Sequence, residues 1–349
     1  MKRITSFILV AIMLLSLVAC ELPWEQAPKP KTREISYMYF NTVSVASAYG
    51  DMSDEQFDAH CSAIDKTLDY YHRLFDIYFE YSGVNNLCTV NKNAGKAPVK
   101  VDAELIDFLL YCKELFTLTN GQTNVMLGSV LKIWHNHREA ADSDPKSAGV
   151  PDAATLAEAA KHTDIDSLVI DKSASTVYIS DPMASIDVGA IGKGYVTELL
   201  YRDLKAEGVD SFALNIGGNL RTIGKKPDGS DWSTGITNPN RTSDESLICR
   251  VSMGDTSLVT SGDYERYYTV DGVNYHHIID PDTLMPADYF TSVSVFTPDS
   301  ALADALSTAL FCMSYEDGLE FVEELGDVEV IWIDKDYSIR STDGVVFIK

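Results

Sequence analysis

The sequence has few basic residues for its length, and this shortage argues against one class of function. Among 349 residues there are 28 Lys and Arg against 52 Asp and Glu, which gives a formal net charge of -24. No cluster of Lys or Arg offsets that charge locally, so the chain would repel a phosphodiester backbone. We therefore expect no nucleic-acid partner. An anionic ligand would need a metal ion or a placed cation.

The cysteines lack the spacing of a zinc site or a disulfide framework. There are six, with irregular separations and no Cys-x-x-Cys pair. For Cys112 and Cys312 the surrounding pattern favours small buried residues of helices. The apolar fraction of 45% and the aromatic fraction of 10% are ordinary, which excludes a disordered, collagen-like or multi-span membrane chain.

An apolar run at the N-terminus has the features of an export signal. Lys2 and Arg3 precede a segment too short to span a bilayer comfortably. The segment ends in Leu-Val-Ala-Cys, which resembles the bacterial lipobox, with Cys20 lipidated after removal of residues 1–19. Acyl chains on Cys20 would anchor the protein on the extracytoplasmic face of the cell membrane. The alternative is an ordinary signal with an incidental cysteine.

The rest of the chain predicts a tether followed by one domain. Residues 20–34 carry three prolines among polar residues and are typical of an extended tether. In residues 35–349 helices and strands are mixed, which predicts an α+β fold of mostly antiparallel sheets with flanking helices. Helices are expected over 53–79 with Ser53 as N-cap, 103–118, 152–161, 193–207 and 300–313. Strands are expected over 35–48, 168–170, 176–179, 211–214, 249–253, 267–270, 291–297, 329–334 and 345–348.

Two glycine-rich segments are candidate ligand sites. In residues 187–195, DVGAIGKGY, the glycines permit a tight turn, and the amides of the following helix N-terminus favour an anion. This is not a Walker A loop, because Gly194 stands where Ser or Thr would bind magnesium. Residues 215–221, NIGGNLR, lack the spacing of a Rossmann fingerprint. Taken alone, the first segment could be a turn with a solvated Lys193, and the second a strand bulge.

A third segment brings a titratable base and a carboxylate together. His276, His277 and Asp280 lie at a predicted strand end that is closed by Pro281. A neutral imidazole there could accept a hydroxyl proton near pH 7. Adjacent strand residues point to opposite faces, so at most one of the two histidines would enter a given site. Paired surface histidines are the alternative interpretation.

A fourth segment suits a hard cation. Asp304 and Thr308 are four residues apart on a predicted helix and therefore share a face. A carboxylate and a hydroxyl oxygen in this arrangement suit Mg²⁺, which keeps waters and binds ligand phosphates. In isolation, a buried polar pair is the alternative.

Together these segments resemble the ApbE family, the bacterial FAD:protein FMN transferases. The matching motifs are IDVGAIGKGY, LNIGGNLRTIGKKPDG, TSGDYERYY with HHIIDP, and SVSVFTPDSALADALSTALF. They occur in family order, and the resemblance spans residues 36–344. It implies an ApbE-like fold and a Mg²⁺-dependent reaction. In that reaction the FAD pyrophosphate is cleaved, FMN is joined by a phosphoester bond to a threonine of a target protein, and AMP is released.

The resemblance also implies which residues form the site. The carbonyl of Ala190, together with Asp304 and Thr308, would hold magnesium. His277 would be the general base, which makes His277 and Asp304 the catalytic pair. The implied FAD-binding residues are Phe40, Thr42, Tyr81, Thr123, Asn124, Asp187, Lys193, Gly217, Gly218 and His277. The implied acceptor is a subunit of a membrane redox complex.

Departures from the family pattern keep alternatives open. Thr123 and Asn124 replace a phenylalanine and an aspartate, Asn219 replaces the aspartate of a GGD segment, and Leu284 replaces a glycine. Related lipoproteins hydrolyse FAD to FMN and AMP, so an FAD pyrophosphatase is one alternative and a non-catalytic FAD-binding lipoprotein is another. A solute-binding lipoprotein would need two α/β lobes with parallel sheets, which the hairpin-rich pattern disfavours.

Overall fold

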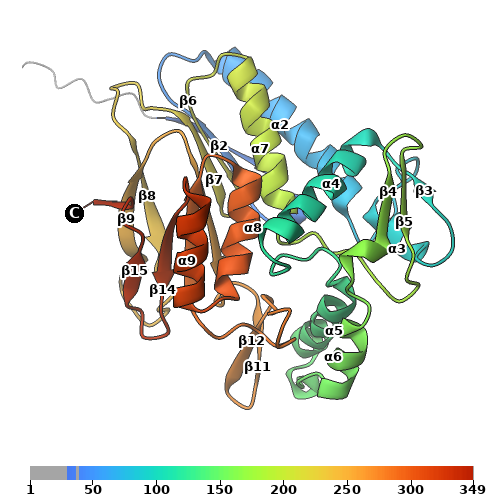
Figure 1. Cartoon of the computed structure of the whole chain (residues 1–349). Coiled ribbons are helices and arrows are strands. Elements are labelled where there is room, and N and C mark those ends of the chain that lie inside the picture. The colour runs from blue at the N-terminus through green and yellow to red at the C-terminus, as the bar shows by residue number, and fades with distance from the viewer. Residues whose placement is uncertain (1–29, 37–38, 349) are drawn as a thin grey trace, which may run out of the picture.

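The computed structural model describes residues 30–36 and 39–348, in which helices and strands are mixed (Figure 1). The expected export signal, Cys20 and most of the tether lie outside the described residues. Paired strands are antiparallel in every sheet of the described part. The expected α+β fold with mostly antiparallel sheets is therefore confirmed.

One large sheet organises the fold, with eight strands in the order β1-β2-β6-β7-β10-β13-β14-β15. Its strands are β1 (Lys31–Ser36), β2 (Ser44–Ala48), β6 (Ser211–Ile216), β7 (Asn219–Gly224), β10 (Ser257–Gly262), β13 (Ser292–Thr297), β14 (Glu329–Ile333) and β15 (Ile339–Ser341). The smaller sheets are β16-β9-β8, β3-β5-β4 and the β11-β12 hairpin. Their strands are β3 (Val99–Lys100), β4 (Leu168–Asp171), β5 (Thr176–Ile179), β8 (Trp232–Thr237), β9 (Leu247–Met253), β11 (Tyr267–Val270), β12 (Val273–His276) and β16 (Val346–Ile348).

The helices differ in how they relate to this sheet. α2, α7, α8 and α9 are close to it (Figure 1). α3 and α4 lie beside the small β3-β5-β4 sheet, and α5 and α6 lie together near the β11-β12 hairpin (Figure 1). The α-helices are α2 (Asp54–Phe75), α3 (Leu87–Lys92), α4 (Ala103–Leu118), α5 (Gly128–Ser143), α6 (Ala153–Ala160), α7 (Gly192–Ala206), α8 (Ser300–Phe311) and α9 (Tyr315–Leu325). Short 3₁₀ turns are η1 (Tyr39–Asn41), η2 (Pro145–Ser147) and η3 (Ile165–Ser167).

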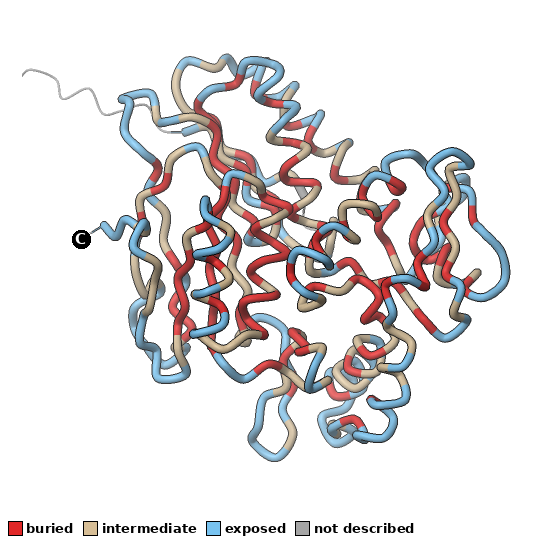
Figure 2. The backbone as a smooth tube through the Cα atoms, in the orientation of Figure 1, coloured by how far each residue is buried: buried red, intermediate tan, exposed pale blue. Residues whose placement is uncertain are grey.

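The large sheet is covered on both faces. In β14, Val330 and Trp332 join the cluster under α8 and α9, whereas Ile331 and Ile333 pack with residues of β8 and β9. This alternation is the period of two that a strand imposes on its side chains. The central strands and α8 are consequently buried almost throughout (Figure 2).

Helix α8 is buried nearly all round because small residues allow close approach. Ala and Ser fill much of its surface, and it contacts α7, β10 and β13. The tightest crossing is at Gly194 of α7, where a Cβ would overlap the carbonyl oxygen of Ser300 and lie 2.5 Å from the Cβ of Asp304. Only glycine fits this position without displacing a helix.

Several expected elements differ from the structure by one or two residues at an end, and two differ by more. The strand predicted over 35–48 is instead β1, the turn η1 and β2, so residues 31–34 belong to the domain rather than to the tether. The helix predicted over 53–79 begins after the expected cap, since the Ser53 hydroxyl accepts the Gln56 N–H. It ends at Phe75, because Asp76 turns to an extended conformation and its carboxylate accepts the amides of Tyr78 and Phe79.

Several helices and strands were not expected from the pattern. Helix α5 is one, although its buried Val130, Trp134 and Ala141 follow helical spacing. The glycines and polar residues that precede it obscure its start. Helices α3 and α9 and strands β3, β7, β8, β10, β12 and β15 are the others.

The cysteines of the described part are free thiols. Cys112 is fully buried in α4, and burial raises the pKa of its thiol well above the usual value. Cys312 is buried immediately after the last residue of α8. The prediction of small buried residues is confirmed for both. In residues 30–36 and 39–348, no helix is long and apolar enough to cross a membrane.

Replacing Gly194 should destabilise the fold through the α7–α8 crossing. We expect Gly194→Ala to lower the free energy of unfolding by about 1–3 kcal/mol, the usual cost of overpacking. Gly149→Ala is the matched control, because a Cβ at Gly149 meets no atom within 4 Å, and its effect should stay within about 0.5 kcal/mol. Urea unfolding measures both. Equal stability of Gly194→Ala and wild type would contradict the close crossing.

Candidate active site

Asp304 of α8 contacts the start of α7. Its Oδ2 accepts the Gly194 N–H at 2.8 Å and the Asn219 side-chain amide at 3.1 Å. The Lys193 ammonium lies 3.4 Å from each carboxylate oxygen. The Gly194 amide belongs to the first turn of α7, where N–H groups have no partner within the helix. A carboxylate of one helix therefore caps the N-terminus of the other.

The capping is reciprocal. Glu198 of α7 accepts the Ser300 N–H, in the first turn of α8, at 3.0 Å. Burial raises the pKa of this carboxyl group, while the Ser300 amide opposes that shift. The guanidinium of Arg221, itself buried, stacks 3.5 Å over the Tyr201 ring and approaches the same carboxylate to 3.8 Å. These contacts fix the position of α7 relative to α8, and therefore that of Lys193 relative to Asp304.

The oxygen atoms around Asp304 fit a hard cation. Among the described residues, Asp304 Oδ1 has a hydrogen bond or ion pair only with Lys193, and the half-buried Thr308 hydroxyl has none. Ala190 lies four residues before Gly194, in the turn that leads into α7. Within residues 30–36 and 39–348, no cluster of three or more His, Cys, Asp or Glu could hold a metal. A cation held by one carboxylate, one hydroxyl and one carbonyl would complete its shell with waters or ligand phosphates.

His277 and His276 have different environments. His276, the last residue of β12, is buried with Nε2 2.9 Å from the carbonyl oxygen of Ala287 and its ring against Phe311. His277 follows the strand, and its backbone N–H donates to the carbonyl oxygen of Arg266 at 3.1 Å. Its Nδ1 is buried without a hydrogen-bond partner among the described residues. His277 is thus the one with an unused ring nitrogen.

The charge state of His277 follows from its surroundings. Burial holds its pKa well below the usual value of 6.5, and the positive charges of Arg266, Arg138 and Lys193 lower it further, as does His276. A neutral imidazole with a free ring nitrogen is able to accept a proton.

Asp187 lies in the loop before α7 and is only partly exposed. Its Oδ1 accepts the Gly189 N–H at 2.9 Å. Burial raises the pKa of its carboxyl group, whereas the Gly189 amide and the nearby Arg266 oppose the shift. Asn91 exchanges two hydrogen bonds with the backbone of the preceding Ile186, at 2.8 and 2.9 Å, and so anchors this loop.

The turn at Phe40 leads to Thr42, whose side chain lies against Gly217. Phe40 has a φ of 55°, in the left-handed region that a phenylalanine rarely adopts. Gly217 has a φ of 57°, and a Cβ there would overlap the side chain of Thr42. Its N–H donates to the carbonyl oxygen of Val43 at 3.0 Å. The adjacent Gly218 donates its N–H to the Asn215 side chain at 2.9 Å.

Tyr81 belongs to the same region as Phe40, because both rings contact the His72 ring, at 6.5 and 5.7 Å between centroids. The Tyr81 hydroxyl donates to Asp76 Oδ2 at 2.7 Å. Burial, with help from this hydrogen bond, raises the pKa of Tyr81 to about 12.

Thr123 and Asn124 have protein partners for their polar atoms. The Thr123 hydroxyl donates to the carbonyl oxygen of Ala305, the residue after Asp304, at 2.8 Å. Asn124 donates to the carbonyl oxygen of Thr163 at 2.9 Å and accepts the Met126 N–H at 2.8 Å. The two side chains join the start of α5 to its neighbours. Their contact with FAD stays a prediction.

Sequence reasoning missed the residues that orient this site. Asn219, which contacts Asp304, stands out in the sequence only as a departure from the family pattern. Arg266 stands inside the TSGDYERYY motif but received no role. Glu198 and Arg221 also lie within or beside the motifs, whereas Arg138 carries no local signal.

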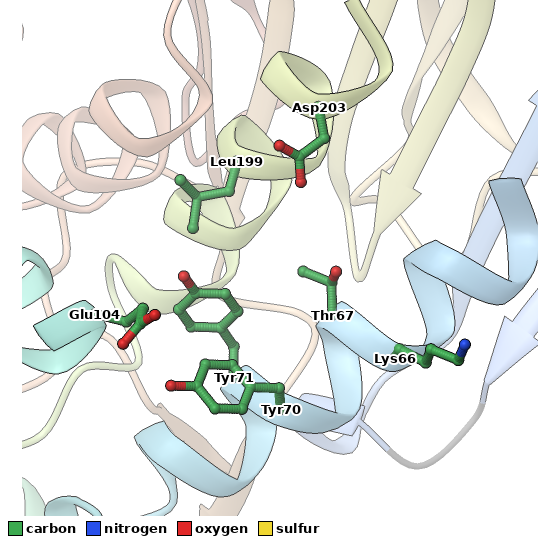
Figure 3. A pocket seen from close by; sticks show the side chains of 7 residues that line it. All are labelled: Lys66, Thr67, Tyr70, Tyr71, Glu104, Leu199 and Asp203. Carbon is green, nitrogen blue, oxygen red and sulfur yellow. The ribbon is translucent and has the colours of Figure 1, made fainter. Parts of the chain in front are cut away.

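A separate hollow of about 370 Å³ lies between α2, α4 and α7 (Figure 3). It is lined by Lys66, Thr67, Tyr70, Tyr71, Glu104, Leu199 and Asp203. None of the predicted site residues lines it. The hydrogen bonds of Asp304 join Lys193 and Asn219 at the start of α7. Phe40 and Tyr81 meet at His72, apart from this hollow.

Comparison with known proteins identifies the family of this chain. The ApbE family model matches residues 26–332. An FAD:protein FMN transferase of Treponema pallidum is 34% identical over 274 residues, which is 74% of each chain. One from Haemophilus influenzae is 27% identical over 330 residues, 93% of this chain and 91% of its own. The crystal structure of the ApbE protein from Thermotoga maritima is similar with a TM-score of 0.77 at 25% identity, covering 90% of this chain and 97% of the other. This chain therefore belongs to the ApbE family.

Proposed function

We propose that this protein is a Mg²⁺-dependent FAD:protein FMN transferase. The observation that carries the proposal is the arrangement at the start of α7, where Asp304 meets Lys193 and where a neutral His277 lies within electrostatic reach. The relatives named FAD:protein FMN transferase support the same activity. Lys193 would bind the FAD pyrophosphate, and its positive charge offsets the acidic balance of the chain locally.

The residues divide the chemistry between them. Asp304, Thr308 and the Ala190 carbonyl would hold magnesium, which when bound neutralises phosphate charge. His277 would take the proton from the threonine hydroxyl of the acceptor as the oxygen attacks the FMN phosphorus. The bond between that phosphorus and the bridging oxygen breaks, and AMP leaves with the bridging oxygen.

We also propose that the enzyme is held at the extracytoplasmic face of the cell membrane by lipid on Cys20. The lipobox-like sequence and the proline-containing segment after it support this location. An acceptor threonine on a membrane redox subunit would then be within reach of the tethered domain.

Removing the Asp304 carboxylate should abolish metal-dependent transfer. We expect Asp304→Asn to reduce Mg²⁺-dependent flavinylation of an acceptor at least about 100-fold, since the isosteric amide keeps the shape but loses the charge. Asp317→Asn, a substitution at the start of α9, is the control and should behave as wild type. Full activity of Asp304→Asn would remove Asp304 from the metal site.

Removing the His277 imidazole should slow transfer without preventing FAD binding. We expect His277→Ala to reduce the transfer rate about 10²–10⁴-fold, the usual contribution of a general base. His276→Ala should instead lower thermal stability, because that ring is buried and hydrogen-bonded. Fluorescence titration with FAD and single-turnover transfer separate the two effects. Equal loss of FAD binding in His277→Ala would indicate a structural histidine.

The low pKa of His277 predicts activity in mild acid. His277 stays neutral as the pH falls through 6.5, so kcat/KM for FAD should keep its plateau there. Only the unfolded chain takes up a proton on His277 in that range, so this residue lowers the free energy of unfolding as the pH falls. A pH profile from 5 to 9 measures the first effect. An acid limb centred at 6.5 that disappears in His277→Ala would contradict the assignment.

A further inference from the structure

Arg138 and Arg266, which come from distant parts of the sequence, both lie within electrostatic reach of His277. Helix α5 packs on the β11-β12 hairpin (Figure 1): Trp134 stacks on Tyr275 at 5.9 Å and donates its Nε1–H to the carbonyl oxygen of Leu284 at 2.9 Å. Arg138 is one helical turn after Trp134 and therefore shares its face. Arg266 directly precedes β11, and its carbonyl oxygen accepts the backbone N–H of His277.

Neighbouring side chains hold Arg138 in place. Its Nη2 lies 2.9 Å from Nδ1 of His135, so the guanidinium donates to the ring. The His135 ring lies 5.2 Å from that of Tyr78, in the loop organised by Asp76. Arg138 is thus positioned by a side chain of its own helix rather than by a carboxylate.

Neither guanidinium forms an ion pair with a residue of the described part of the chain. Burial and the positive charge of Arg138 lower the pKa of Arg266, and both cations also act on His277 and Asp187. Two like charges without an ion-pair partner are unusual in a chain of net charge -24. Their repulsion is offset when an anion binds between them, and guanidinium groups match phosphate oxygens in bidentate geometry.

We propose that Arg138 and Arg266 form a phosphate subsite beside His277 that binds the nucleotide pyrophosphate, in addition to the Lys193–Asp304 site. The inference rests on the proposed function for its ligand. A bound phosphate also neutralises two of the cations that act on His277, so the substrate itself makes His277 a better base at the moment of transfer. In the free enzyme burial, together with the same cations, keeps the imidazole unprotonated.

Binding without turnover tests the subsite. The full chain, purified in detergent without magnesium, is titrated calorimetrically with FAD, FMN, AMP and riboflavin. We expect Arg138→Gln and Arg266→Gln each to weaken FAD binding at least about tenfold, the usual worth of a charged hydrogen bond, and to leave riboflavin binding unchanged. If the variants also lose affinity for FMN but not for AMP, the arginine pair binds the FMN phosphate. If they lose affinity for AMP but not for FMN, the pair binds the AMP phosphate. Arg250→Gln, which removes an exposed arginine of β9, should match wild type.

Two further readouts separate this role from a structural one. Unliganded Arg266→Gln should unfold at the same temperature as wild type or higher, because a like-charge repulsion is removed, and Arg266→Lys should recover part of the affinity. In turnover, Arg266→Gln should move the acid limb of kcat/KM to higher pH. Unchanged affinity for FAD, FMN and AMP in both glutamine variants, or an equal loss for riboflavin, would overturn the subsite. Nucleotide binding by wild type without AMP release would instead refute only the proposed function.

Discussion

The site depends on reciprocal hydrogen bonds between α7 and α8, in which a carboxylate of each helix accepts a backbone amide of the other. Asp304 of α8 accepts an amide from the first turn of α7, and Glu198 of α7 accepts one from the first turn of α8. Each helix start has unpaired N–H groups and a partial positive charge, so each carboxylate is stabilised where it is buried. These hydrogen bonds join the two helices where Gly194 allows them to approach closely. Lys193, the residue before Gly194, is therefore held close to Asp304.

This arrangement explains how a protein with a net charge of -24 can bind an anionic substrate. The overall charge repels phosphate, yet Lys193, Arg138 and Arg266 place positive charge within electrostatic reach of His277. Burial and the same cations keep the imidazole neutral. Electrostatic attraction and a proton acceptor are therefore supplied by one local cluster, while the acidic surface elsewhere lowers non-specific binding of polyanions.

Features set by local sequence could be predicted, and features set by long-range contacts could not. The start of α7 follows from its glycine-rich turn, the shared face of Asp304 and Thr308 follows from helical spacing, and strand alternation indicated that at most one of the two histidines would enter the site. Asn219 and Gly194 reach Asp304 across 85 and 110 residues, and no local pattern encodes those distances. The division of residues 35–48 among β1, η1 and β2 was missed because two of the three residues of the η1 turn are aromatic, a residue type that is also common in strands.

The most direct test of the account follows both products of one reaction. The purified protein is incubated with FAD and Mg²⁺, with and without an acceptor protein that bears a suitable threonine, while AMP is quantified and the acceptor mass is measured. The account predicts AMP release that requires the acceptor, with one covalent FMN for each AMP. AMP without an adduct would contradict transfer and indicate an FAD pyrophosphatase, and intact bound FAD without AMP would indicate a non-catalytic flavin-binding lipoprotein.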